Sequence, residues 1–215
     1  MTYATYQRVR MSLNNFSIVF AGENFPISSI KTTDFVFRHR ELVETVRLPV
    51  LLQAAAGGAS IDVLHDRFVA AVTSPDKVEV QTEGLQDLAR TFLEYVGKRT
   101  IRATGHNLQF SLDGVDAPKQ KIADHFLRRT AVQDALGSPV FGADLQFLFD
   151  GDNHSRVRVG LVTEGVDVPT IDFNFNFEAA EISPEDALTA FGDSYRRALT
   201  IVEKLRQAIE SEVTV

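Results

Sequence analysis

The chain has 215 residues, of which 44% are hydrophobic and 24% are charged, and it carries a formal net charge of −7. A chain of this length and composition buries a core of its own, which excludes a wholly disordered or fibrous protein. The negative charge repels phosphate backbones, so we expect no nucleic-acid partner.

Cysteine is absent, which excludes thiol nucleophiles, thiolate metal sites and disulfides. The N-terminal residues lack the apolar run of a signal peptide, and no stretch of the sequence is long and apolar enough to span a membrane. We therefore expect a cytoplasmic protein that has no contact with a membrane. The preference for arginine over lysine favours a bacterial source.

Segments rich in β-forming residues, separated by turn residues, fill the first part of the chain. Residues 1–13 are polar and without period, which predicts a frayed or edge segment. Pro49 predicts an edge strand or a break, and the glycines of 54–59 predict a flexible turn. The predicted strands are 16–20, 43–52, 61–64, 68–72 and 78–81.

One helix and one long strand follow. Gly84 and Gly97 bracket an apolar stripe at helical spacing, so we expect a helix between them. In the next strand the apolar positions change parity, because Ile101 and Leu108 would lie on opposite faces of a regular strand. The sequence therefore predicts a β-bulge at 105–107.

A helix and three strands are expected next. The helix runs from Pro118 to about Leu136, where Gly137 and the proline beyond it provide a stop. The strands are expected at 145–149, 157–161 and 171–177, and the last of them alternates phenylalanine with polar residues.

The C-terminal helix has the clearest pattern in the chain. Ser183 is a typical N-cap and Pro184 suits the first helical position, so we expect a long helix over 184–211. Its apolar residues recur at helical spacing, and this seam fits two arrangements: a helix that packs across the protein's own sheet, or one that also pairs with a second copy in a homodimer. The residues that would form such an interface are Leu188, Phe191, Tyr195, Val202, Leu205 and Ile209.

This order of elements predicts an α+β fold, with an antiparallel sheet or sheets of about seven to nine strands packed by three helices. Consecutive strands joined by short turns are antiparallel, and the helices do not alternate one for one with strands. We expect residues 1–215 to form a single domain, since no linker-like stretch is present, although it can divide into lobes at 14–113 and 118–215.

The sequence carries no familiar catalytic or binding motif. The histidines are not spaced as metal ligands, the glycines form no phosphate-binding loop, and the Gly-x-Ser-x-Gly motif of hydrolases is missing. The sequence therefore predicts no catalytic residue, no metal site and no cofactor. We expect a non-catalytic protein-interaction or accessory protein, whose partner is another protein or a second copy of itself.

An alternative is a small-molecule-binding protein or hydrolase with a pocket between the sheet and the helices. His106 and Asn107 lie in the predicted bulge, and bulges often re-aim side chains beside functional sites. Asp172 lies on the polar side of a later strand and would supply a carboxylate. These three residues form the candidate ligand-binding set, and the competing interpretation of the bulge is that it bends the sheet around a helix.

The block from Pro75 to Phe110 reads as strand, helix and strand, and the second strand contains Gly105, His106 and Asn107. This block resembles an uncharacterised, sporadically distributed bacterial family, in which a helix leads into a strand with a Gly-x-Asn ending and another helix lies near the C-terminus. His106 stands where that family has an aromatic residue. The resemblance covers a short part of the chain, and it implies a bacterial accessory protein without transferring an activity or a site residue.

Overall fold

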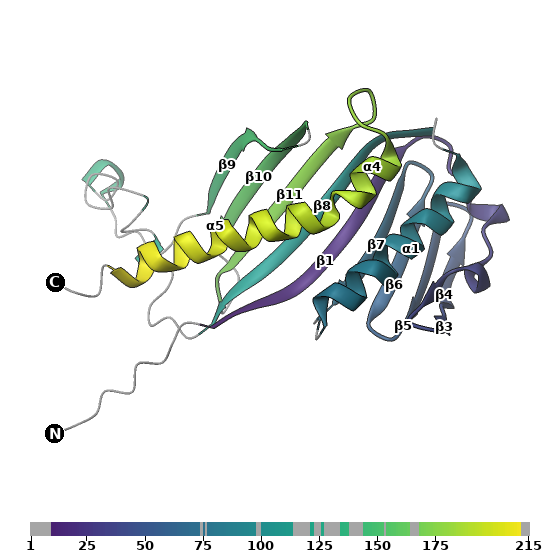
Figure 1. Ribbon diagram of the computed structural model, residues 1–215, viewed down its shortest axis with the longest axis horizontal. Coiled ribbons are helices and arrows are strands. Elements are labelled where there is room, and N and C mark those ends of the chain that lie inside the picture. Colours follow the sequence, from purple (N-terminus) through teal and green to yellow (C-terminus); the bar gives the residue numbers. More distant parts are fainter. Residues whose placement is uncertain are drawn as a thin grey trace, which may run out of the picture.

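A nine-stranded antiparallel sheet with helices on one face forms the body of the protein, which is the predicted α+β architecture (Figure 1). The computed structural model describes residues 10–73, 75, 77–97, 100–113, 121–122, 126, 134–137, 144–152, 154–163 and 168–211. Most of the helix expected from Pro118 to about Leu136 lies outside these residues. Within them, no helix has both the length and the apolar character needed to cross a membrane.

The elements follow one another along the chain as strands, a helix, strands and two helices. The strands of the large sheet are β1 (Arg10–Gly22), β4 (Val43–Leu48), β5 (Leu51–Ala56), β6 (Ala59–Leu64), β7 (Arg67–Thr73), β8 (Ile101–Asp113), β9 (Leu145–Asp150), β10 (Ser155–Val162) and β11 (Thr170–Glu178). The helices are α1 (Val78–Val96), α4 (Pro184–Thr189) and α5 (Phe191–Ser211), with the short 3-10 turns η1 (Ile27–Ser29) and η2 (Thr32–Asp34). A small separate sheet pairs β2 (Val36–Phe37) with β3 (Arg40–Glu41).

The order of strands across the sheet is β4-β5-β6-β7-β1-β8-β11-β10-β9. The two long strands β1 and β8, of 13 residues each, pair at its centre. The same order of elements occurs on each side of this pair. A long strand comes first, a meander of shorter strands follows whose last strand pairs with the long strand, and a helix comes last. The meander and helix are β5, β6, β7 and α1 after β1, and β9, β10, β11 and α4–α5 after β8. The fold thus contains two similar halves that the sequence does not reveal as a repeat.

The change from one half to the other falls between α1 and β8, at residues 97–101. The lobes expected from the sequence would instead divide at 113–118, which lies after β8. Because β1 pairs with β8 along almost its whole length, the sheet runs without interruption through both halves.

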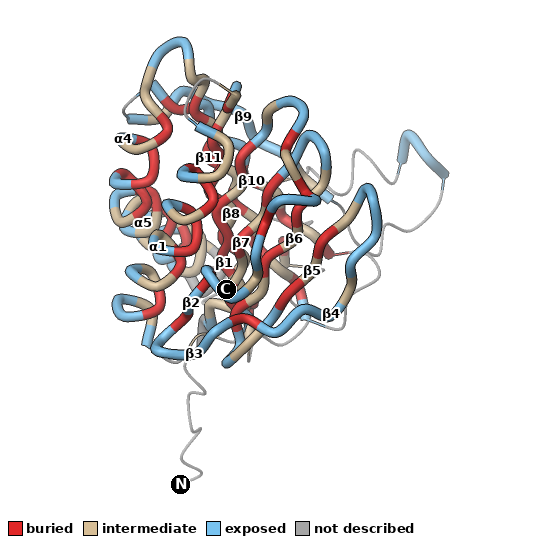
Figure 2. The backbone as a smooth tube through the Cα atoms, turned by 90° about the vertical axis from the view of Figure 1, so that its right-hand side faces the viewer, coloured by how far each residue is buried: buried red, intermediate tan, exposed pale blue. Residues whose placement is uncertain are grey.

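The core lies between the sheet and its helices. Figure 2 shows α1, α4 and α5 together on one side of the sheet. Aromatic rings fill this layer, and the closest pair is Phe68 of β7 with Phe92 of α1, whose ring centroids are 4.1 Å apart. Alternation along the strands places these rings on the helix side. The buried phenylalanines of the large sheet are Phe16, Phe20, Phe68, Phe110, Phe173, Phe175 and Phe177.

The described part of the N-terminal segment departs from its prediction, and residues 1–9 lie outside the described residues. Residues 10–13 belong to β1, which is a central strand and not a frayed edge. The polar residues that hid this strand are hydrogen bonded across it: the hydroxyl of Ser12 lies 2.7 Å from that of Ser111 and donates to the carboxylate of Asp113. Met11 and Leu13 alternate with polar residues, but a register shift between Leu13 and Asn15 puts this alternation out of step with that of 16–20.

Residues 78–81 are the first turn of α1, and the prediction of a strand there was wrong. Four alternating residues also fit one turn of a helix, in which Gln81 is buried and Val80 is half exposed. Gly84 therefore lies inside the helix and does not begin it. A Cβ atom at this position would come within 2.8 Å of the ring of Phe37, so the glycine allows β2 to pack closely against α1.

The C-terminal helix forms as predicted, with a break. Ser183 caps α4, because its hydroxyl accepts a hydrogen bond from the backbone N–H of Asp186 at 3.2 Å. The helix is interrupted at Ala190, after which α5 continues across the second half of the sheet (Figure 1).

Candidate functional site

The bulge in β8 lies closer to the start of the strand than predicted. Ala21 of β1 pairs with Ala103 and Gly22 pairs with Ile101, so Arg102 is the extra residue. From Ala103 onward β8 is regular. The sequence predicted the bulge correctly but placed it at 105–107. Its true position is Arg102, because Ile101 is the only apolar residue of β8 that lies out of step with the rest of the strand.

His106 consequently points into the core. Its ring is fully buried, with the ring centroids of Phe177 at 4.8 Å and Phe191 at 5.0 Å. Nδ1 lies 2.9 Å from the hydroxyl of Ser194, which is itself buried on α5. His106 therefore joins β8 to α5 inside the protein.

Burial lowers the pKa of His106 to about 3. The nearby carbonyl of Ala187 opposes this shift only in part, and Nε2 has no hydrogen-bond partner among the described residues. The imidazole is therefore neutral at ordinary pH and does not meet solvent. These properties suit a core side chain better than a general base in a pocket.

Asn107 lies on the opposite face of the sheet, which no described helix covers, because consecutive residues of a strand alternate. Its Oδ1 accepts a hydrogen bond from Nδ2 of Asn174 at 2.6 Å, and its Nδ2 donates to the hydroxyl of Ser17 at 3.2 Å. Asp172 faces the same side from β11. The structure thus brings Asn107 and Asp172 together and places His106 apart from them.

We call the depression around these residues the open-face hollow. It has a volume of about 470 Å³ and crosses β1, β8, β11, β10 and β9. Sequence reasoning identified two of its side chains and missed the rest, since membership depends on which residues pair across the strands. The residues lining the hollow are Asn15, Ser17, Asn107, Leu108, Gln109, Gln146, Arg158, Gly160, Val162, Asp172, Phe173 and Asn174.

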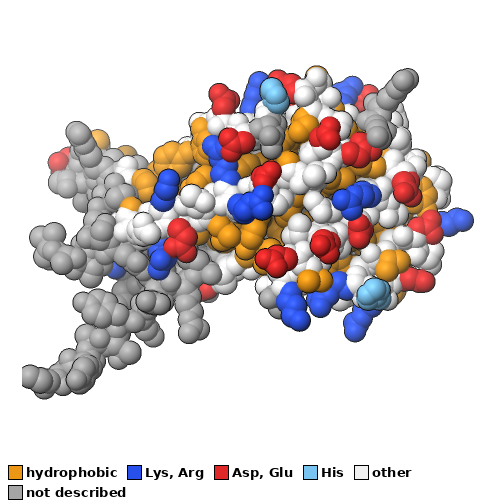
Figure 3. All heavy atoms as spheres, viewed as in Figure 1, with side chains coloured by type: hydrophobic (Ala, Val, Ile, Leu, Met, Phe, Trp, Pro, Cys, Tyr) orange, Lys and Arg blue, Asp and Glu red, His pale blue; other side chains and the backbone are white. Residues whose placement is uncertain are grey.

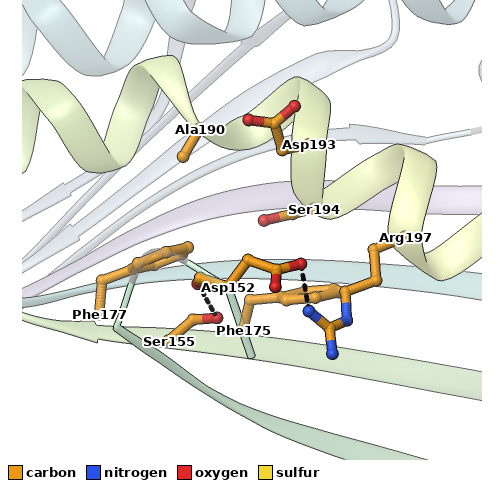
Figure 4. Close-up of a pocket in the computed structure, with 8 residues that line it drawn as sticks. All are labelled: Asp152, Ser155, Phe175, Phe177, Ala190, Asp193, Ser194 and Arg197. Atoms are coloured by element: carbon orange, nitrogen blue, oxygen red, sulfur yellow. Dashed lines mark hydrogen bonds and ion pairs between the residues drawn. The ribbon is translucent and has the colours of Figure 1, made fainter. Parts of the chain in front are cut away.

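A smaller cavity between β10, β11 and α5 holds little more than one water molecule, at about 20 Å³ (Figure 4). Asp152 closes it by an ion pair with Arg197 and by accepting, through its backbone carbonyl, a 2.7 Å hydrogen bond from Ser155. Phe175 and Phe177 form its floor (Figure 4). This cavity is a packing gap, too small for a substrate.

The seam of the C-terminal helix lies against the protein's own sheet. Leu188, Phe191 and Val202 are buried there, and Tyr195 and Leu205 are half-buried. The side chain of Ile209 lies outside the described residues. The three buried residues pack within the protein's own fold, as the first arrangement expects, and pairing of this helix with a second copy stays a prediction.

The outer edge of β9 is a second exposed feature. Among the described residues, β9 pairs only with β10. Three consecutive apolar side chains lie at this edge, with exposed fractions of 42% for Phe147, 75% for Leu148 and 37% for Phe149. A shallow groove lies between Phe149 and α5, and Figure 3 shows hydrophobic side chains at the surface here.

In the described part of the chain, no group of three or more histidine, aspartate or glutamate side chains is arranged to hold a metal ion. The resemblance to a bacterial family stays a prediction. No family model matches the chain, and no curated protein matches it in sequence.

Proposed function

We propose that the protein is a non-catalytic protein-interaction or accessory protein, and that it binds an extended segment of its partner by strand addition along β9. The exposed apolar edge of β9 carries this proposal. A free edge offers unpaired backbone N–H and C=O groups to an incoming strand, and pockets for alternate side chains give selectivity.

The other edge of the same sheet supports this interpretation by contrast. β4 is irregular between Glu44 and Val46, carries the Glu44–Arg47 ion pair and ends before Pro49. Bulges, charges and proline are the devices by which edge strands avoid pairing with other chains. β9 has none of them within its apolar run, and its single charged residue is Asp150 at the end.

A second copy of this chain is the occupant that we favour. Leu145, Phe147 and Phe149 share the helix side of β9. When two identical strands pair antiparallel, residues of one face always oppose residues of the same face. Apolar residues would therefore meet apolar residues in every such register, and cross-strand aromatic pairs stabilise a sheet.

A peptide of the β9 sequence, Leu-Gln-Phe-Leu-Phe-Asp with lysines added at both ends for solubility, tests the edge directly. We expect saturable binding by fluorescence anisotropy and a dimer of the free protein in sedimentation equilibrium. Leu148→Lys should weaken both by at least about tenfold, because it places a charge beside the incoming strand. Val43→Lys is the matched control, since Val43 is 67% exposed on the opposite edge, and it should change neither.

If the wild type is a monomer but still binds the peptide, the partner of β9 is a strand from another protein and not a second copy of this chain. Absence of both peptide binding and self-association would overturn strand addition. Equal losses in Leu148→Lys and Val43→Lys would also overturn it, since the effect would then not belong to β9.

Small-molecule binding is the second candidate function, favoured by the open-face hollow. It no longer involves His106, because that side chain lies on the other side of the sheet. The cytoplasmic location and bacterial source remain proposals that rest on composition alone.

A further inference from the structure

Gly160 forms part of the floor of the open-face hollow, and the fold does not require a glycine there. It lies in the middle of β10, and its φ is not positive. A Cβ atom added to it would meet nothing closer than 3.9 Å, which is ordinary contact. Glycine inside a strand is unfavourable and often marks a place where a ligand approaches the backbone. A side chain at this position would occupy the hollow.

Two opposite charges line the hollow without neutralising each other. Asp172 lies directly across from Gly160, and Arg158 lies two residues before Gly160 in β10, across from Asn174. Neither forms an ion pair with a described residue, and Oδ1 of Asp172 is shielded from solvent with no hydrogen-bond partner. A carboxylate oxygen shielded from solvent without a partner is costly, which points to a donor that the described residues do not supply.

Amide side chains fill the space around the two charges. Asn107 and Asn174 are held by the hydrogen bonds that run from β11 to Ser17. Gln109 pairs across the strands with Asp172, and the side chain of Gln146 on β9 also lines the hollow. Each amide offers both a donor and an acceptor, which matches the groups of a peptide bond or of a polar side chain.

We propose that the open-face hollow binds a zwitterionic ligand, from a free amino acid to a short peptide in size. Its ammonium group would bind Asp172, its carboxylate would bind Arg158, and its amide or polar groups would meet Asn107 and Gln109. The charges favour this class over others. A phosphate would find one guanidinium beside a carboxylate, and a metal ion would find one carboxylate only.

This site and the edge of β9 share one strand, since Gln146 lines the hollow and Leu148 pairs with Arg158, but the two proposals rest on different groups. The hollow lies on the face of the sheet away from the helices, whereas the groove at Phe149 lies beside α5. Either proposal can fail while the other holds.

Backbone amide chemical shifts in the ¹⁵N-labelled full chain provide the test, with triglycine, N-acetyl-triglycine amide and pools of the free amino acids as probes. We expect saturable shifts confined to β8, β10 and β11 around the hollow for triglycine or for at least one pool. The blocked peptide should not bind, since it has neither charge. Asp172→Asn and Arg158→Gln should each raise the dissociation constant roughly tenfold or more.

Gly160→Val separates a filled site from a damaged fold. The valine should abolish binding while the melting temperature stays equal or rises, because valine favours strands and its Cβ meets no close neighbour. Gly105→Ala is the matched control: this glycine faces the same side from β8, its added Cβ would also lie at ordinary contact distances, and it does not line the hollow. It should bind as the wild type does.

Three results would overturn the proposal. The first is no localised shift with any probe at about 10 mM, a concentration that detects even weak sites. The second is equal binding of triglycine and its blocked form. The third is unchanged affinity in Gly160→Val or in both charge variants.

Discussion

At the scale of single residues, His106 shows how one extra residue in a strand decides which face of the sheet a side chain lies on. The extra residue in β8 is Arg102, and everything after it keeps one alternation. His106 therefore faces Phe177 and Phe191, while Asn107 faces the open side. The sequence revealed that a bulge was needed, but with Gly105 nearby it favoured the wrong place for it.

Acid should weaken the protein through His106. Its pKa in the fold, about 3, lies below the ordinary value of 6.5, so its contribution is complete above pH 6.5 and is lost as the pH falls toward 3. In this range the unfolded chain takes up a proton that the folded chain does not, which costs about 1.4 kcal/mol per pH unit. Urea unfolding between pH 7 and about 4.5 should show a shallower pH dependence for His106→Asn than for wild type.

The comparison of the two proteins removes the contribution of the carboxylates, which both share. Parallel curves for wild type and His106→Asn would mean that the imidazole is protonated in the folded state after all.

Gly84 carries a second prediction at this scale. Alanine in a helix interior is ordinarily about 1 kcal/mol more favourable than glycine. Here its Cβ would lie 2.8 Å from the ring of Phe37, so we expect Gly84→Ala to destabilise the protein by about 1–2 kcal/mol in urea unfolding. The double variant Gly84→Ala, Phe37→Leu should show less than the sum of the two single losses. Strict additivity would contradict the close contact.

At the scale of elements, the sequence predicted best where a pattern is long and unbroken. β11 alternates over nine residues, and the apolar seam of α4–α5 continues for several turns. Patterns of this length rarely arise by chance, so each indicates one type of secondary structure. Residues 78–81 and 10–13 failed for the opposite reason. The first segment is too short to distinguish a strand from a helical turn. In the second, the register shift between Leu13 and Asn15 puts the apolar alternation out of step with that of 16–20.

The cap of α4 gives a prediction for an element. Ser183 accepts from the N–H of Asp186 and donates to its carboxylate at 2.7 Å, which fixes the start of the helix. Ser183→Ala should cost about 1 kcal/mol in the free energy of unfolding, whereas Ser183→Asp should retain most of the stability. Equal losses in both variants would show that another contact, and not the cap, orders this helix end.

At the scale of the whole molecule, the composition of the candidate site could not be predicted. Asn107 and Asp172 were identified from the sequence, but Arg158, Gly160 and Gln109 join them only through the pairing of β8, β11 and β10. Register between strands far apart in the chain follows from the packing of both halves, which no single segment encodes. The antiparallel class follows more simply from the short turns between consecutive strands. The individual strands do not, since the predicted strand 43–52 divides into β4 and β5 and the predicted strand 78–81 is helical.

The central pair should be the most stable part of the molecule. β1 and β8 are covered by neighbouring strands on both sides and carry the buried residues Phe16, Ile18 and Leu108. We expect the slowest amide hydrogen exchange in these two strands and faster exchange in β9, at the edge. Earlier exchange in β1 and β8 than in α1 would contradict this order and would indicate that the two halves open along their shared pair.

The short connection from α1 to β8 allows the same fold to form with a different order of its two halves along the chain. Each half closes its own meander, so no strand pairing depends on the covalent link at residues 97–101. The start of β1 and the end of α5 lie toward the same end of the molecule (Figure 1). A circular permutant that opens at this passage and joins the end of α5 to the start of β1 by a flexible linker would preserve every described pair of strands and reverse the order in which the two halves are synthesised.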